Sequence, residues 1–75
     1  MDIKQILGNR VRELRKKNKL SQEKLAYIAE LDRTYINSIE NGRRNVSINN
    51  IKKIADAFGI SMKDFFDSES FADKR

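Results

Sequence analysis

The stretch that decides the fold is SQEKLAYIAELDRTYINSIENG, residues 21–42. It contains two short helical patterns with only about three residues between them to turn the corner. Apolar or small side chains would bury one side of each helix on a shared core, and they are Leu25, Ala26, Ala29, Leu31, Ile36 and Ile39. The second pattern leaves one face free, and its side chains all hydrogen-bond to base edges: Arg33, Thr34, Asn37 and Ser38. A helix supported in this way with such a face is typical of readers of the DNA major groove.

The remaining sequence also has helical spacing. Ile3, Leu7, Val11 and Leu14 recur on one face and predict a helix over 3–17. The other four expected helices have a Ser or Asp as N-cap, and glycine ends two of them. They run from Ser21 to about Ala29, from Asp32 to Asn41–Gly42, from Ser47 to Gly59, and over 62–66 after Ser61. We therefore expect an all-α domain of five helices over 1–75, with its core at 3–66 and a polar, fraying tail at 67–75.

The corner between the two central helices holds Glu30. DNA-binding versions of this motif usually have glycine there, because the backbone turns with a positive φ. A residue with a side chain costs on the order of 1 kcal/mol in that conformation. A generic pair of antiparallel helices with the same apolar positions is the alternative interpretation.

The composition excludes several classes of site. The 75 residues include no cysteine and no histidine, so disulfides, thiolate metal sites and the usual general base are absent. We expect no metal, no cofactor, no small-molecule ligand and no enzymatic activity. No apolar run approaches the roughly 18 residues that a membrane span needs, so we expect a cytoplasmic protein without a leader. A domain of this size buries only about 60% of its unfolded surface and gains stability from a partner.

The net charge of +5 is concentrated at one end. Residues 1–20 contain seven Lys or Arg against two Asp or Glu, which gives the whole excess of +5. This asymmetry favours a polyanionic partner. A solvated amphipathic helix would explain the same charges.

Four segments resemble a known family. They are LGNRVRELR (7–15), SQEKLA (21–26), IENGRRN (39–45) and IADAFGIS (54–61). Together they resemble the lambda-repressor-like, Cro/Xre-type DNA-binding domains over about residues 6–66, with the helix-turn-helix in the second and third helices. LDRTYI (31–36) followed by RRN (43–45) is most similar to controller proteins of restriction–modification systems.

The resemblance implies a transcriptional regulator that binds a pseudo-palindromic double-stranded DNA operator as a homodimer. For a controller protein it also implies autoregulation and timed expression of an endonuclease gene, with RNA polymerase as a further candidate partner. A phage-type repressor or an antitoxin regulator of the same fold is the nearest alternative. A helical protein–protein adaptor without a DNA role is a more distant one.

The resemblance also assigns roles to residues. Base contacts fall on Arg33, Thr34, Asn37 and Ser38, and backbone contacts on Gln22, Tyr27, Tyr35, Arg43, Arg44 and Asn45. Gln22 would also brace the third helix. Tyr35 could instead pack inward beside the fourth helix, and Arg33 could instead pair with Glu30 or Asp32. Arg15 and Glu40 fall where many family members have a partly buried ion pair.

Apolar residues near the C-terminus exceed what five small helices need. Pairing of two copies through this region would bury the excess and place two recognition helices about 34 Å apart, one turn of DNA. The expected interface residues are Ile48, Ile60, Met62, Phe65 and Phe66. In the alternative interpretation, Phe65 and Phe66 only close the core of the monomer.

Overall fold

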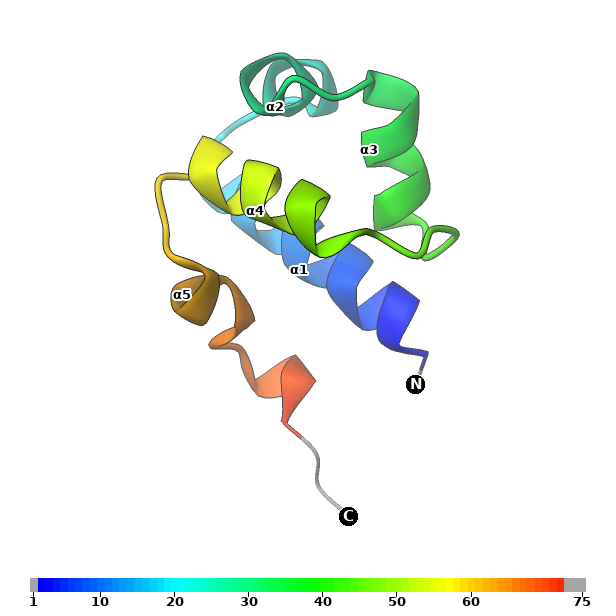
Figure 1. Cartoon of the computed structure of the whole chain (residues 1–75), viewed down its shortest axis with the longest axis vertical. Helices are drawn as coiled ribbons and strands as arrows, with labels where there is room; N and C mark the ends of the chain where they lie inside the picture. Colours follow the sequence, from blue (N-terminus) through cyan, green and yellow to red (C-terminus); the bar gives the residue numbers. More distant parts are fainter. Residues whose placement is uncertain (1, 73–75) are drawn as a thin grey trace.

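The computed structural model describes residues 2–72 and is helical throughout (Figure 1). Its elements are α1 (Ile3–Lys17), α2 (Gln22–Ala29), α3 (Arg33–Glu40), α4 (Ile48–Ala57), α5 (Met62–Phe66) and a 3₁₀ turn, η1 (Glu69–Phe71). The all-α fold of five helices predicted from the sequence is confirmed, and residues 2–72 contain no strand. None of the helices in this range combines the length and the apolar character that crossing a membrane requires.

Serine side chains begin three of the helices. Ser21, Ser47 and Ser61 each accept a hydrogen bond from the backbone N–H three residues further on, at 3.0 to 3.1 Å. These bonds satisfy N–H groups that have no partner inside the helix. Asp2 begins α1 in a similar way, with a bond from the N–H of Lys4. Asp32 occupies the N-cap position of α3 but makes no side-chain capping bond, so its expected capping interaction is not present.

The corner between α2 and α3 has the backbone conformation expected for it. Glu30 lies in the left-handed region with φ 59° and ψ 44°, and its N–H bonds back to the carbonyl of Tyr27. Lys19 adopts the same conformation between α1 and α2, with φ 58°, which the sequence pattern did not indicate. Gly42 and Gly59 follow α3 and α4 with φ 71° and 72°. Each of the four links that join α1 to α5 in chain order therefore contains one residue with a left-handed backbone.

The hydrophobic core is formed by all five helices. Its fully buried side chains include Val11 from α1, Leu25 from α2, Ile36 from α3, Ile54 from α4 and Phe65 from α5. α3 packs against both α1 and α2, while α4 packs against α2 and α5. These contacts fix the angle at which α3 stands out at the edge of the molecule (Figure 1).

A glycine allows α1 and α3 to approach closely. A Cβ added to Gly8 on α1 would collide with the carbonyl oxygen of Ile39 and lie 3.0 Å from Cα of Glu40. Glycine at this position lets the backbone of α1 lie directly against the end of α3. The position of α3 therefore depends on a residue that has no side chain.

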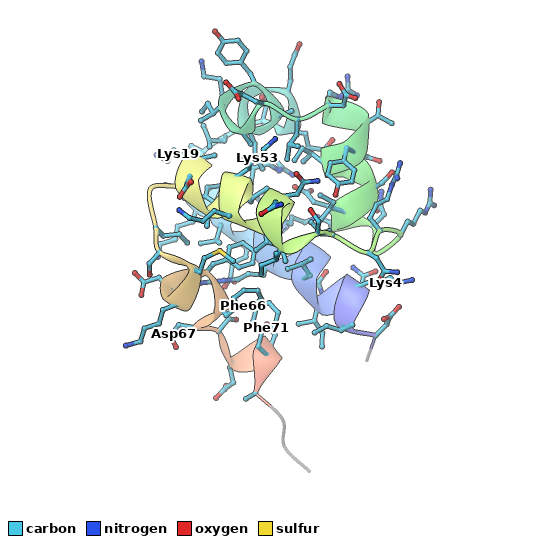
Figure 2. The ribbon with its side chains drawn as sticks, in the orientation of Figure 1. Lys4, Lys19, Lys53, Phe66, Asp67 and Phe71 are labelled. Carbon is cyan, nitrogen blue, oxygen red and sulfur yellow. The ribbon has the colours of Figure 1, made fainter. Side chains whose placement is uncertain are left out.

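The C-terminal segment contains features that the sequence did not predict. Residues 69–71 form η1, and Phe71 packs against Phe66 with ring centroids 5.1 Å apart (Figure 2). The turn and the aromatic contact were not predicted, whereas fraying of the tail stays a prediction; residues 73–75 lie outside the described range. Phe65 is fully buried in the core of the monomer, so its assignment to an interface is wrong.

Candidate nucleic-acid interface

The outward face of α3 carries the predicted base contacts. Arg33, Thr34 and Asn37 are exposed, and Ser38 is half-buried. Within the described residues, Arg33 forms no ion pair, so the alternative pairing with Glu30 or Asp32 does not occur. Its guanidinium has five N–H donors available for a partner outside the chain.

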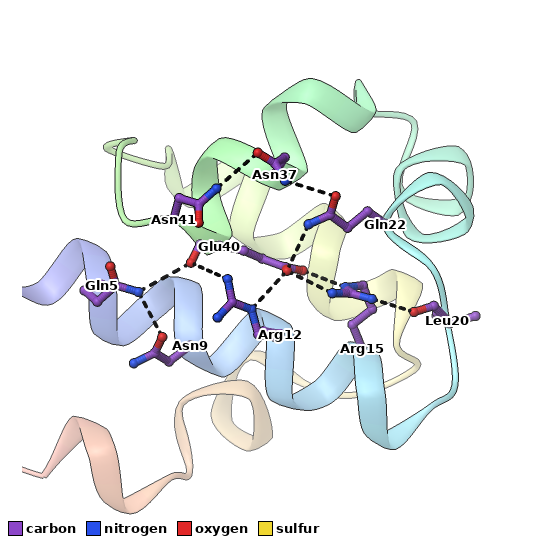
Figure 3. A network of polar contacts seen from close by, with 9 residues as sticks. All are labelled: Gln5, Asn9, Arg12, Arg15, Leu20, Gln22, Asn37, Glu40 and Asn41. Atoms are coloured by element: carbon purple, nitrogen blue, oxygen red, sulfur yellow. Dashed lines mark hydrogen bonds and ion pairs between the residues drawn. The ribbon is translucent and has the colours of Figure 1, made fainter.

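A buried carboxylate lies behind this face. Glu40, at the end of α3, has no exposed surface, and Arg15 of α1 grips it with two hydrogen bonds of 2.7 and 3.0 Å (Figure 3). Arg12 approaches the same carboxylate at 3.4 Å. The structure thus places Arg15 and Glu40 in the ion pair that the family resemblance implies, and it adds Arg12, which sequence reasoning missed.

These neighbours determine the charge on Glu40. Burial alone would raise the pKa of its carboxyl, but hydrogen bonds from Arg15 and Gln22 and the charge of Arg15 outweigh burial and lower that pKa. The hydrogen bond to Glu40 in turn raises the pKa of Arg15. Glu40 is therefore an anion at neutral pH, and it can only accept hydrogen bonds.

A chain of amides connects Glu40 to the outward face of α3. Gln22 Nε2 donates to Glu40 Oε1 at 3.1 Å, and Gln22 Oε1 accepts from Asn37 Nδ2 at 3.2 Å. Asn37 Oδ1 then accepts from Asn41 Nδ2 at 3.1 Å. Because Glu40 must accept, each amide in the chain has one orientation (Figure 3). Gln22 thus braces α3 as expected, and Asn41 joins a network that the sequence did not reveal.

Tyr35 has a different environment from the other α3 residues. It is half-buried, and its hydroxyl accepts a hydrogen bond from Asn50 Nδ2 of α4 at 3.1 Å. The guanidinium carbon of Arg44 lies 5.3 Å from the centre of its ring. Tyr35 thus contacts α4, as in the alternative interpretation, but it is only half-buried, and a contact with the DNA backbone stays a prediction. The ring still borders an open hollow of about 600 Å³, lined by Glu30, Leu31, Asp32, Thr34, Tyr35, Arg44 and Asn50.

The other predicted backbone contacts lie at the surface. Arg43, Arg44 and Asn45 are exposed in the loop between α3 and α4. Tyr27 of α2 is 77% exposed, with the ammonium of Lys24 5.6 Å from its ring centre. Contacts of these residues with DNA stay predictions.

Part of the basic charge at the N-terminus serves the fold instead of a partner. Arg10 donates to the carbonyls of Phe65 and Asp64 at 2.7 and 2.8 Å and so binds the end of α5. Arg12 and Arg15 are engaged with Glu40. The bases of residues 1–20 that form no ion pair within the described chain are Lys4, Lys16, Lys17 and Lys19. The charge count alone therefore overstates the basic surface available to a polyanion.

The remaining residues of the expected interface vary in exposure. Ile48, at the start of α4, is 64% exposed, and Phe66 is 37% exposed. Ile60 and Met62 are half-buried and pack against the core. Of the five residues, Ile48 thus leaves the most apolar surface uncovered.

Comparisons with known proteins agree with this geometry. A family model described as helix-turn-helix matches residues 11–65. The control protein C.BamHI of Bacillus amyloliquefaciens is 49% identical over 67 residues, which cover 88% of this chain and 83% of that protein.

Two solved structures are similar in both fold and sequence. The restriction–modification controller protein C.AhdI from Aeromonas hydrophila superposes with a TM-score of 0.84 at 44% identity, covering 88% of this chain and all of that one. The controller protein C.Esp1396I, solved as a tetramer in complex with its natural 35 base-pair operator, superposes with a TM-score of 0.82 at 32% identity and covers 88% and 87% of the two chains. The chain therefore belongs to the helix-turn-helix family of Cro/Xre type, and its relatives within that family are controller proteins of restriction–modification systems.

Proposed function

We propose that this chain is a sequence-specific DNA-binding transcriptional regulator that acts as a homodimer on a pseudo-palindromic operator, as a controller protein of a restriction–modification system. The observation that carries the proposal is the exposed face of α3, where Arg33, Thr34 and Asn37 project from a helix whose inner end is held by the Glu40 network. Such a helix enters the major groove without having to order itself first, because its supports are already formed.

Arg33 reads bases in this proposal. A guanidinium can donate two parallel hydrogen bonds to O6 and N7 of guanine, and such a pair discriminates against a wrong base by about 1–3 kcal/mol. Arg33 lies in the first turn of α3, and helix-turn-helix proteins contact base edges from the N-terminal part of this helix. Thr34, Asn37 and Ser38 extend the reading face along the helix.

Other elements hold the phosphate backbone. Gln22 at the start of α2, Tyr27, Tyr35 and the loop residues 43–45 are the proposed backbone contacts. Such contacts fix register and supply most of the salt-dependent affinity, but they carry no base specificity. The proposal involves binding without catalysis and a location in the cytoplasm, where the operator would lie.

The operator is the DNA upstream of the protein's own gene. The relative C.Esp1396I, solved with its natural 35 base-pair operator, supports an operator long enough for more than one dimer. A second copy of this chain would present a second α3 about 34 Å away, one DNA turn from the first.

Footprinting on that upstream DNA tests the proposal. At about 150 mM salt we expect a protected, pseudo-symmetric site, and binding to a scrambled duplex of the same length at least ~10³-fold weaker. Arg33→Ala should raise the protein concentration needed for protection roughly tenfold to a hundredfold, whereas Lys53→Ala, which removes an exposed cation on α4, should leave it unchanged. Equal affinity for the two duplexes would contradict the proposal, because binding would then depend only on phosphate charge.

A further inference from the structure

Asn50 is a residue of α4 to which the sequence pattern assigns no role, yet it contacts the recognition helix. Its Nδ2 donates a 3.1 Å hydrogen bond to the hydroxyl of Tyr35. Asn50 is half-buried, and its backbone N–H is already bonded to the capping side chain of Ser47. The first turn of α4 therefore holds the amide of Asn50 against α3.

The direction of this hydrogen bond determines what Tyr35 can offer. An amide nitrogen only donates, so the Tyr35 hydroxyl must accept from Asn50. A phenolic hydroxyl has one proton of its own, and it remains available after the oxygen has accepted a bond. Within residues 2–72, no protein group accepts a bond from that hydroxyl. Tyr35 is thus left as a hydrogen-bond donor beside the open hollow described above.

A second donor lies next to it. The guanidinium of Arg44 is held 5.3 Å from the centre of the Tyr35 ring, on the loop between α3 and α4. Glu30 and Asp32 line the same hollow, and their carboxylates disfavour an anion on their side of it. The part of the hollow beside Tyr35 and Arg44 is therefore more favourable for a phosphate than the part beside Glu30 and Asp32. There the Tyr35 hydroxyl proton and the Arg44 cation would both face the phosphate.

We propose that Asn50 is a positioning residue that fixes the Tyr35 hydroxyl as a hydrogen-bond donor to a DNA phosphate oxygen beside Arg44. This inference rests on the proposed function, since it assigns one backbone contact within the same interface. It also assigns Asn50 a task without direct contact with DNA, because its amide acts through Tyr35.

Replacing Asn50 by aspartate reverses the hydrogen bond. A carboxylate only accepts, so in Asn50→Asp the Tyr35 proton turns toward α4 and away from DNA. The variant also adds a negative charge near DNA, and Asn49→Asp controls for this charge. Asn49 is the neighbouring residue, is exposed and makes no side-chain hydrogen bond within the described chain. Tyr35→Phe removes the hydroxyl in both backgrounds.

Dissociation constants are measured for all variants on an operator duplex and on an unrelated duplex at one salt concentration. We expect Asn50→Asp to weaken binding roughly fivefold to tenfold more than Asn49→Asp does, which is typical for one hydrogen bond. In the Tyr35→Phe background, the two aspartate variants should bind equally. The extra loss should appear on both duplexes, because a phosphate contact is independent of sequence.

Three outcomes overturn the inference. Equal losses for Asn50→Asp and Asn49→Asp show that only charge matters. An extra loss that persists in Tyr35→Phe shows that Asn50 acts on DNA directly. A loss confined to the operator duplex assigns Tyr35 to a base instead of a phosphate.

Melting curves establish that each variant is folded, and Asn50→Ala repeats the cycle without a charge if Asn50→Asp does not fold. We expect a smaller loss for Asn50→Ala, again absent in Tyr35→Phe. The free protein provides a separate readout, because the NMR signals of the Asn50 side-chain amide should shift in Tyr35→Phe. A shifted amide together with a wild-type protein that does not prefer its operator would contradict the proposed function but leave the contact between Asn50 and Tyr35 in place.

Discussion

Arg33 is the residue of α3 whose loss should cost the most specificity. It is exposed and unpaired within the described chain, so Arg33→Ala removes a base contact without leaving a buried partner unsatisfied. We expect operator affinity to fall by about 1–3 kcal/mol, roughly tenfold to a hundredfold, while affinity for unrelated DNA falls much less. Titrations on both duplexes measure the two losses. Equal losses on the two duplexes would show that Arg33 contacts only phosphate.

Glu40 is the residue that connects stability to pH. Its pKa is lowered in the folded protein, so its ionisation stabilises the fold at any pH above its unfolded pKa. That contribution is lost as the pH falls through the lowered, folded pKa. Glu40→Gln should therefore be less stable than wild type at neutral pH, with a difference that narrows in acid. Urea unfolding between pH 7 and pH 3 tests this, and a constant difference would contradict it.

The partner of Glu40 gives the matching test. Arg15→Met leaves a carboxylate with no exposed surface without its main partner, and breaking such a buried pair typically costs 3–5 kcal/mol. Lys17→Met, on the same helix but exposed, is the control and should change little. A wild-type melting temperature for Arg15→Met would show that Arg12 and Gln22 suffice to hold the carboxylate.

At the scale of elements, the corner between α2 and α3 stores strain. Glu30 has a left-handed backbone, which costs a residue with a side chain on the order of 1 kcal/mol. Glu30→Gly should therefore raise the free energy of unfolding by up to about 1 kcal/mol, less the extra entropy of an unfolded glycine. Glu30→Ala removes the same carboxylate but keeps a Cβ, so it should bring no such gain. Chemical denaturation of wild type, Glu30→Gly and Glu30→Ala measures the three free energies of unfolding. Equal values for the glycine and alanine variants would show that the backbone of Glu30 is not strained.

The helices were predictable because their signals are local. Ser21, Ser47 and Ser61 cap helices through bonds to residues three positions away, and Gly42 and Gly59 end helices through their own φ. All of these signals lie within a few residues of the helix end that they determine, so a short stretch of sequence is enough to recognise them. Each predicted helix therefore appears at nearly its predicted bounds.

The site was only partly predictable because much of it depends on contacts between distant segments. Arg10 was counted as surface charge, but it binds carbonyls at the end of α5, more than fifty residues away. Asn50 meets Tyr35 only once the fold brings the start of α4 to α3, and Phe71 lies beside Ile3 and Leu7 of α1 only once the chain has turned after α5. No local pattern distinguishes an arginine that binds DNA from one that caps a helix.

At the scale of the whole molecule, the proposed function assigns base recognition and phosphate binding to different elements. In the proposed function α3 presents the side chains that choose bases, whereas Arg12 and Arg15 pair with Glu40 and serve the fold. The cations left for phosphates lie on the loop after α3 and at the two ends of α1. A single copy therefore offers one short helix face for base contacts and a modest number of cations for phosphates. Tight operator binding should require a second copy, which doubles both.

Ile48 provides the test of that pairing. It is 64% exposed at the start of α4, and Ile3 at the start of α1 is 61% exposed but lies outside the expected interface. Ile48→Lys should therefore yield a folded monomer, whereas Ile3→Lys should still form the dimer. Sedimentation across a range of concentrations measures this, and melting curves show that both variants are folded. On an operator, Ile48→Lys should occupy each half-site independently and weakly, because the second recognition helix is no longer held one DNA turn from the first. A dimeric Ile48→Lys, or an Ile3→Lys that is also monomeric, would move the interface away from α4.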